Sequence, residues 1–222
     1  MNLERDGDVF VLDIGSDENR FHPDWVAAFN DALDTLEGTE GPRALVTSAS
    51  GKFWSNGLDL DWVQANPEQG GSYLGSVHQL FARVLGFAAP TVASIQGHCF
   101  AAGAMISLAH DFRVMREDRG FWCLPEVDIG LPFSPGMSAL VQARLSKKTA
   151  HEAMTTGRRY GGTDALAAGI VDAAASETQV LSAAVERAAA LAPKAGPALG
   201  AIKARMYEDA LRILTDPFAG GE

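Results

Sequence analysis

Hydrophobic residues follow two alternating spacings along the first part of the chain. Residues 8–14 (DVFVLDI) and 43–47 (RALVT) are short runs rich in β-branched side chains, which predicts two strands. Between them, from residue 25 to residue 36, large apolar residues recur about four positions apart, which predicts a helix. We expect Asp24 to cap this helix and Gly38 to end it in a left-handed conformation.

The same alternation continues in the middle of the chain. Residues 90–96 (PTVASIQ) and 111–115 (DFRVM) are predicted strands, and residues 101–110 (AAGAMISLAH) form a predicted apolar helix between them. After Pro135 the pattern becomes mostly helical. The order of elements predicts an α/β fold with a helical C-terminal section. Residues 66–72 (NPEQGGS) have the proline, glycine and polar content of a mobile loop.

Composition and charge narrow the class of protein. The 222 residues are 47% hydrophobic and 21% charged, which is typical of a globular chain with one principal domain. The formal charge of −10 argues against binding to nucleic acid or to an anionic membrane. The N-terminus lacks the apolar segment of a secretory signal, so we expect a cytoplasmic protein. Cys99 and Cys123 lie in apolar surroundings and are predicted to be buried free thiols.

Several familiar signatures are missing from the sequence. It contains no G-x-G-x-x-G, no G-x-x-x-x-G-K-[ST] and no G-x-S-x-G motif. Its five histidines lack the i, i+4 spacing of a helical zinc pair. We therefore expect neither a metal site nor a nucleotide cofactor.

Two glycine-containing turns carry the first candidate chemistry. Residues 51–62 (GKFWSNGLDLDW) and 96–111 (QGHCFAAGAMISLAHD) each follow a predicted strand and lead toward a helix. The first amides of a helix have no partner inside it and lie at the positive end of its dipole. Two such turns facing each other could bind a developing oxyanion. From the residues alone, glycines that serve only close packing are an equally good explanation of these turns.

Glu126 is a carboxylate inside the apolar run FWCLPEVDIGLPFSPGM at residues 121–137. Burial there would raise its pKa and suit it to act as a general base. The alternative is a structural carboxylate paired with Arg113 or Arg116, and the residues alone favour that alternative. Asp128 is expected to be structural or solvated.

The order of three motifs resembles a known family. F-W-S-N-G-L-D-L is followed by I-Q-G-x-x-x-A-A-G-A-M and then by L-P-E-V-D-I-G-L, with AHEAMTTGRRYGGTDALAAGIVD further on. With these motifs the chain resembles the crotonase (enoyl-CoA hydratase/isomerase) superfamily from about residue 8 to about residue 210.

The resemblance implies a crotonase-like spiral of ββα turns. It implies one unit over residues 1–192, the spiral core with its following helices, and a second over residues 193–222, a C-terminal helix and tail used for oligomerisation. A homo-oligomer is then expected, either a trimer or a dimer of trimers. The implied partner is an acyl-CoA substrate, and no cofactor is expected beyond the coenzyme A that the substrate carries.

The resemblance also assigns site residues. It places the oxyanion hole at the backbone amides of Leu58 and Ala102, and the catalytic carboxylate at Glu126. Further contacts with the substrate or its coenzyme A are implied for Ser55, Asn56, Gly57, Gly103, Arg20 and Lys52. For the phosphates, Lys203 or Arg205 of a neighbouring subunit are further candidates, because the loop SDENRFHP offers Arg20 as its only cation.

The reaction is narrowed by Met105. Hydratases of the family use two glutamates, and Met105 stands at the position that matches the first of them. A thioether cannot activate or protonate a water. The resemblance is therefore nearest to Δ3,Δ2-enoyl-CoA isomerases, in which Glu126 would move a proton from C2 to C4 and form trans-2-enoyl-CoA during fatty acid metabolism. Enoyl-CoA hydratase, another thioester reaction, and a non-catalytic acyl-CoA-binding protein are the alternatives.

Overall fold

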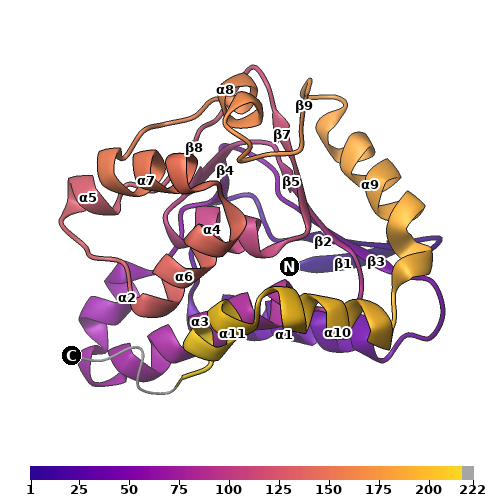
Figure 1. The fold of residues 1–222 in the computed structure, drawn as a ribbon, viewed down its shortest axis with the longest axis horizontal. Coiled ribbons are helices and arrows are strands. Elements are labelled where there is room, and N and C mark those ends of the chain that lie inside the picture. Colours follow the sequence, from indigo (N-terminus) through magenta and orange to yellow (C-terminus); the bar gives the residue numbers. More distant parts are fainter. Residues whose placement is uncertain (217–222) are drawn as a thin grey trace.

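The computed structural model describes residues 1–216, and repeated strand pairs build its centre (Figure 1). Three consecutive pairs each give one strand to a larger sheet and one to a smaller sheet, and helices follow each pair. This arrangement is the expected spiral of ββα units. The strands are β1 (Asn2–Asp6), β2 (Val9–Asp13), β3 (Ala44–Ser48), β4 (Phe53–Ser55), β5 (Thr91–Ile95), β6 (His98–Phe100), β7 (Phe112–Arg116), β8 (Trp122–Cys123) and β9 (Ala173–Ala175).

The six-stranded sheet has the order β1-β2-β3-β5-β7-β9, and the three-stranded sheet has the order β4-β6-β8. All neighbours in both sheets are parallel except β1, which pairs antiparallel with β2. The strands at 8–14, 43–47, 90–96 and 111–115 are confirmed within one or two residues. The sequence pattern did not reveal β1, because its residues are mostly exposed and polar.

Helices cover both faces of the large sheet, and the helical C-terminal section is confirmed (Figure 1). They are α1 (Pro23–Glu37), α2 (Leu60–Ala65), α3 (Gly70–Leu85), α4 (Ala102–Ala109), α5 (Glu126–Ile129), α6 (Pro135–Arg144), α7 (Lys147–Thr156), α8 (Gly162–Ala167), α9 (Val180–Leu191), α10 (Pro197–Met206) and α11 (Glu208–Leu214), with 3₁₀ turns η1 (Pro67–Gln69) and η2 (Ala192–Lys194).

Side chains alternate between the two faces of a strand, so the core has two parts, one on each face of the large sheet. In β3, Ala44 and Val46 face α9 and join a small apolar cluster there. Leu45, between them, points to the opposite face and joins the main core with residues of α1, α3, α4 and α6. Every residue of α4 is buried, so the helix that begins at Ala102 lies inside the molecule.

Three local expectations are wrong. The cap of α1 is His22, whose Nδ1 accepts a hydrogen bond from the Asp24 amide, because Pro23 occupies the first helical position. Gly38 ends that helix in a right-handed conformation (φ −71°). Residues 66–72 are not a loop, since η1 and the first turn of α3 occupy them.

The C-terminal segment contains two helices, α10 and α11, where one was expected. The helical conformation is interrupted between them at Tyr207. Helix α11 packs on α6 and α3 of the same chain. Residues 217–222 of the predicted 193–222 segment lie outside the described residues. Cys99 and Cys123 are buried free thiols, as predicted. Among residues 1–216, no helix is long and apolar enough to cross a membrane.

Candidate active site

The two glycine-containing turns meet through their backbones. A Cβ on Gly57 would lie 2.8 Å from the amide nitrogen of Ala102, and Gly57 has a φ of +84°. A Cβ on Gly103 would lie 2.6 Å from the carbonyl oxygen of Ser55. Any side chain at either position would force the turns apart, so both glycines are required by the close approach.

Two backbone amides at this junction remain free. Among residues 1–216, neither the Leu58 nor the Ala102 amide donates to a protein acceptor. Ala102 is the first residue of α4, where an amide has no partner inside the helix. The preceding residue, Ala101, adopts φ 51° and ψ −127°, a conformation that L residues rarely adopt. The strained conformation of Ala101 sets the orientation of the first peptide of α4. Strain of this kind is typical of functional sites.

Ser55 fixes the first glycine-containing turn through two hydrogen bonds. Its Oγ donates to the carbonyl of Asn19 (2.8 Å) and accepts from the Gly57 amide (3.1 Å). Asn19 in turn donates from Nδ2 to the Trp54 carbonyl (3.0 Å). Ser55 is fully buried and does not line the cavity, whereas its neighbour Asn56 does. Ser55, Gly57 and Gly103 therefore shape the turns, and Asn56 faces the space beside them.

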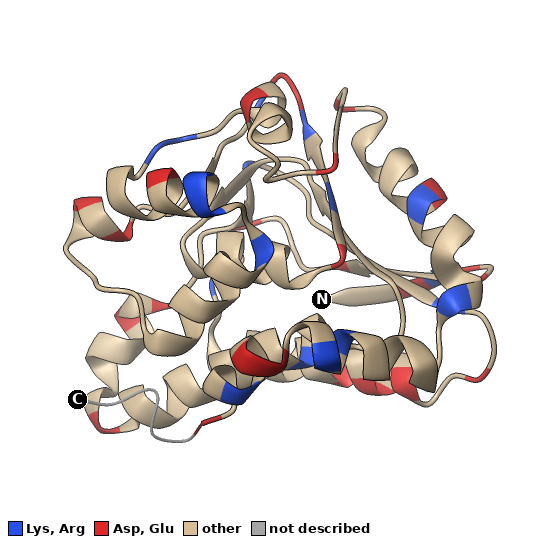
Figure 2. Ribbon diagram, in the orientation of Figure 1, with Lys and Arg blue, Asp and Glu red and all other residues tan. Residues whose placement is uncertain are grey.

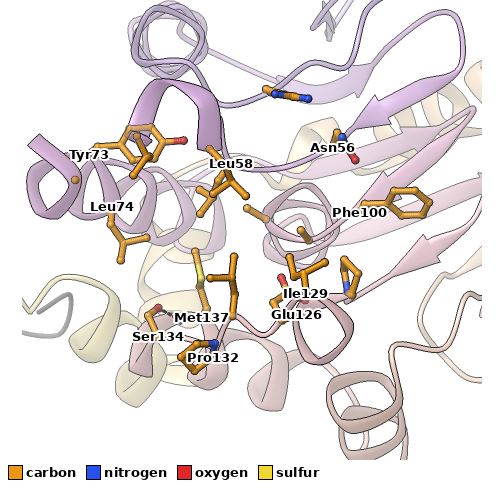
Figure 3. Close-up of a pocket in the computed structure, with 18 of the residues that line it drawn as sticks. Asn56, Leu58, Tyr73, Leu74, Phe100, Glu126, Ile129, Pro132, Ser134 and Met137 are labelled. Carbon is orange, nitrogen blue, oxygen red and sulfur yellow. Dashed lines mark hydrogen bonds between the residues drawn. The ribbon is translucent and has the colours of Figure 1, made fainter. Parts of the chain in front are cut away.

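A cavity of about 670 Å³ opens beside the two turns. Its volume lies in the range of small-molecule sites. Figure 3 places Leu58 and Glu126 on opposite sides of it, and Tyr73 and Leu74 come from α3. Most of the wall is apolar, formed by Leu58, Leu60, Val63, Tyr73, Leu74, Phe100, Ala101, Ala102, Pro125, Ile129, Leu131, Pro132 and Met137.

Glu126 brings a buried carboxylate to this wall. It is the first residue of α5 and only 7% exposed. Burial raises its pKa to about 7 because the charged form loses its hydration. Its Oε2 has no hydrogen-bond partner among the described residues. An unpartnered carboxylate oxygen at this pKa can take up and return a proton near neutral pH.

The predicted alternative that Glu126 pairs with Arg113 or Arg116 is wrong. Arg113 pairs with Asp172 at 3.1 Å. Arg116 pairs with Asp118 and with Glu177. Both guanidinium groups are thus satisfied by other carboxylates, which leaves Glu126 without an ion pair among residues 1–216.

Met105 and Asp128 lie away from the cavity lining. Met105 is fully buried within α4. Asp128 turns toward Gly157, where its Oδ2 would lie 2.4 Å from an added Cβ. The charged residues that line the cavity are Arg20, Asp61 and Glu126, and of these carboxylates only Glu126 is buried.

The cations predicted to contact coenzyme A, Arg20 and Lys52, do not both lie at the cavity. Arg20 lines the cavity, but it pairs with Glu18 (2.5 Å) and Asp61 (2.6 Å). Lys52 is exposed with its Nζ 5.0 Å above the ring of Phe53, and it does not line the cavity. Figure 2 shows acidic residues on both α2 and α5, the two short helices at the cavity.

The expectation that Lys203 is available to a phosphate is wrong. It is 4% exposed, and its Nζ donates to Asp111 (2.6 Å) and to the carbonyls of Phe87 and Ala89. Arg205 is exposed beside Glu208.

Sequence reasoning missed Tyr73, because the first turn of α3 was expected to be a loop. Tyr73 is buried at 4% exposure and lines the cavity. Its hydroxyl accepts a hydrogen bond from the amide of Asp59 (3.0 Å), the residue after Leu58. Tyr73 therefore fixes the turn that presents the Leu58 amide. Tyr73 together with Val77, Leu80 and Phe81 makes a buried stripe at helical spacing, and that signal could have revealed the helix.

Comparison with known proteins fits this geometry. The family model "Enoyl-CoA hydratase/isomerase" matches residues 9–219. Enoyl-CoA delta isomerase 3 of Arabidopsis thaliana is 37% identical, over 96% of this chain and 94% of its own length. Enoyl-CoA delta isomerase 2, peroxisomal, of the same plant is 38% identical over the same shares.

A solved structure confirms the fold class. Human mitochondrial delta3-delta2-enoyl-CoA isomerase superposes with a TM-score of 0.87 at 24% identity, over 95% of this chain and 84% of that one. The spiral of ββα units and this superposition define the fold as that of the crotonase class. The chain belongs to the enoyl-CoA hydratase/isomerase family.

Proposed function

We propose that this chain is a Δ3,Δ2-enoyl-CoA isomerase, which converts a 3-enoyl-CoA into trans-2-enoyl-CoA. One observation carries the proposal: among residues 1–216, Glu126 is the one buried carboxylate that lines the cavity, its pKa is about 7, and Leu58 and Ala102, whose amides are free there, line the same cavity. The names of both plant relatives support the same reaction.

The proposed reaction needs only one proton carrier. The ionised Glu126 takes a proton from C2 of the substrate, and the C–H electrons move into the thioester to form a dienolate. The amides of Leu58 and Ala102 donate hydrogen bonds to the thioester oxygen, which gains negative charge in this step. The protonated Glu126 then gives the proton to C4, and the double bond ends between C2 and C3.

The magnitudes are sufficient for catalysis by this arrangement. A positioned general base typically contributes about 100- to 10,000-fold, and one oxyanion donor roughly 100- to 1,000-fold. The reaction moves a proton within one molecule and changes no oxidation state overall. It therefore calls for no cofactor beyond the coenzyme A of the substrate.

Hydration is disfavoured by the position of Met105. Adding water across a double bond requires a group that holds and activates that water, and Met105 is a buried thioether. Hydration of a 2-enoyl-CoA is the second candidate because the family name includes it.

Binding of the coenzyme A moiety is also part of the proposal. Asn56 contacts the substrate directly, while Ser55, Gly57 and Gly103 hold the oxyanion hole in shape. Arg20 lies at the cavity and Lys52 beside the first turn, so these two are the proposed phosphate contacts. Arg20 would have to exchange a carboxylate partner for a phosphate.

The test uses purified protein and a trans-3-enoyl-CoA, followed by ultraviolet absorbance of the conjugated 2-enoyl thioester. A parallel reaction with crotonyl-CoA measures hydration. We expect conjugation to appear and hydration to be slower by a large factor. Hydration without isomerisation would replace the proposal with the hydratase alternative, and acyl-CoA binding without turnover would favour the non-catalytic role.

A further inference from the structure

Besides Arg20, Asn56, Asp61 and Glu126, one more polar side chain lines the cavity, and it is paired with a buried histidine. Ser134 lines the cavity, and its Oγ lies 2.8 Å from Nε2 of His78 behind it. Figure 3 places Ser134 beside Pro132 and Met137, away from Asn56 and Phe100. The pair thus lies apart from the first turn, beside apolar residues whose chemistry suits an acyl chain.

The hydroxyl of Ser134 has one hydrogen-bonding position left over. A serine hydroxyl offers one donor and two acceptor positions. The Met137 amide donates to Oγ (3.2 Å) and so caps α6, and His78 occupies a second position. Among residues 1–216 no third partner is found. The remaining position belongs to a half-buried residue that lines the cavity.

Helix capping accounts for Ser134 but not for His78. A cap needs only the serine oxygen. His78 is 2% exposed on α3, and placing a polar ring there costs desolvation that an aliphatic residue would avoid. The ring packs against Gly136, where an added Cβ would lie 3.4 Å from two ring atoms, an ordinary contact distance. The fold therefore accommodates an imidazole that does nothing for the cap itself.

The charge state of His78 restricts the ligand. Burial lowers the pKa of His78 below its ordinary value, so the ring is neutral. A carboxylate on the acyl chain would find no positive charge here. If Nε2 carries the proton, Ser134 can donate to a ligand, and if Nδ1 carries it, Ser134 can accept. An alcohol matches both cases because it is donor and acceptor at once.

We propose that Ser134, held by His78, is a subsite for a hydroxyl group on the acyl chain, so that hydroxylated 3-enoyl-CoA thioesters are substrates. This inference rests on the proposed function. An apolar wall would penalise such a hydroxyl, because a buried hydroxyl without a partner is costly. The Ser134 hydroxyl removes that penalty at one position along the chain.

The experiment compares pairs of trans-3-enoyl-CoA thioesters of increasing chain length, each with and without a hydroxyl on the terminal carbon. The quantity measured is the ratio of kcat/KM for the hydroxylated and the plain member. We expect this ratio to peak at one chain length in the natural protein. In Ser134→Ala the ratio at that length should fall by roughly tenfold.

A matched control separates the subsite from damage to α6. Ser138→Ala changes a serine on the same helix that does not line the cavity, and the ratio should stay unchanged. Ser134→Gly serves if Ser134→Ala does not fold, since glycine is a better cap than alanine. A ratio without a peak, or an equal ratio in the Ser134 variants and the natural protein, would overturn the subsite.

Failure of the proposed function gives a different result. If no plain thioester is isomerised, the isomerase proposal is wrong, and calorimetric binding of saturated acyl-CoA with and without the terminal hydroxyl measures the subsite directly. Preference for the hydroxylated ligand that is lost in Ser134→Ala supports it. Equal affinities of the natural protein for the two ligands contradict it.

Discussion

At the scale of single residues, the chemistry depends on the burial of Glu126, which sets its pKa. The same side chain on the surface would be a weak base with an ordinary pKa. Burial beside the cavity, without an ion pair among the described residues, raises its pKa to about 7. The carboxylate is then a stronger base, and its acid form is available at neutral pH to return the proton.

The raised pKa predicts the pH dependence of isomerisation. The base must be ionised to start the reaction, so kcat/KM should rise about tenfold per pH unit below pH 7 and level off above it. The assay is the initial rate at low substrate across a pH series. A rate that is flat from pH 5 to pH 8 would show that the reacting group is not a carboxyl with this pKa.

Tyr73 is a positioning residue for the first oxyanion donor. Tyr73→Phe removes the hydroxyl that accepts from the Asp59 amide, so the turn carrying Leu58 should loosen. We expect kcat to fall by roughly 3- to 10-fold with little change in KM or in the pH profile. Tyr207→Phe, between α10 and α11 and outside the cavity lining, is the control. An increase in KM alone would indicate a contact with bound substrate instead.

At the scale of elements, the sequence predicted long periodic segments well and short ones poorly. The main strands and the helix at 102–109 stood out because they are short, nearly continuous apolar runs, and every residue of β3, β5 and α4 is buried. The strands of the small sheet have two or three residues each, too few for a pattern. The composition of residues 66–72 predicts a loop, yet α3 begins at Gly70. Burial of its later turns outweighs the low helix propensity of Gly70 and Gly71.

Two glycines with opposite surroundings test the interlocked turns. Gly57→Ala adds a Cβ 2.8 Å from the Ala102 amide at φ +84°, so we expect a loss of roughly 1 to 3 kcal/mol in stability and a large loss of activity. Gly75→Ala, within α3 and open to space, should stabilise the protein by about 1 kcal/mol. Thermal unfolding and turnover measure both effects. Equal behaviour of the two variants would contradict the close approach.

At the scale of the whole molecule, a buried ion pair joins the C-terminal helices to the core. Lys203 of α10 reaches Asp111, at the start of β7, through a hydrogen bond of 2.6 Å. The expected division of the chain into one unit over residues 1–192 and a second over residues 193–222 stays a prediction. Trimer formation and a cytoplasmic location likewise stay predictions. Ile202 and Met206 are exposed and lie four residues apart on α10.

Removal of Lys203 should destabilise the whole chain. Lys203→Met removes the charged partner of Asp111, which keeps only its hydrogen bonds from Thr91, and it removes the donor to two carbonyls. Breaking such a buried pair costs about 3 to 5 kcal/mol. Arg205→Met, two residues away and exposed, should change stability by less than about 0.5 kcal/mol. Chemical denaturation compares the two variants. A similar small effect for both would mean that α10 contributes little to the fold.

The site could be predicted from sequence only where a motif marked it. Glu126 and the two glycine turns stood in recognisable order, so their positions followed from the resemblance. The free amides, the lack of a partner for Glu126 Oε2 within residues 1–216 and the role of Tyr73 depend on contacts between segments far apart in the chain. Local patterns do not encode such contacts, because any apolar residue at the same spacing would give the same prediction.

The most direct test of the account compares turnover of a trans-3-enoyl-CoA by the natural protein and by Glu126→Gln, together with calorimetric binding of a saturated acyl-CoA. Glutamine keeps the shape of the side chain but cannot take up the proton. We predict a loss of about 100- to 10,000-fold in turnover with binding retained. Turnover that is unchanged in Glu126→Gln would contradict the account, because another group would then have to carry the proton.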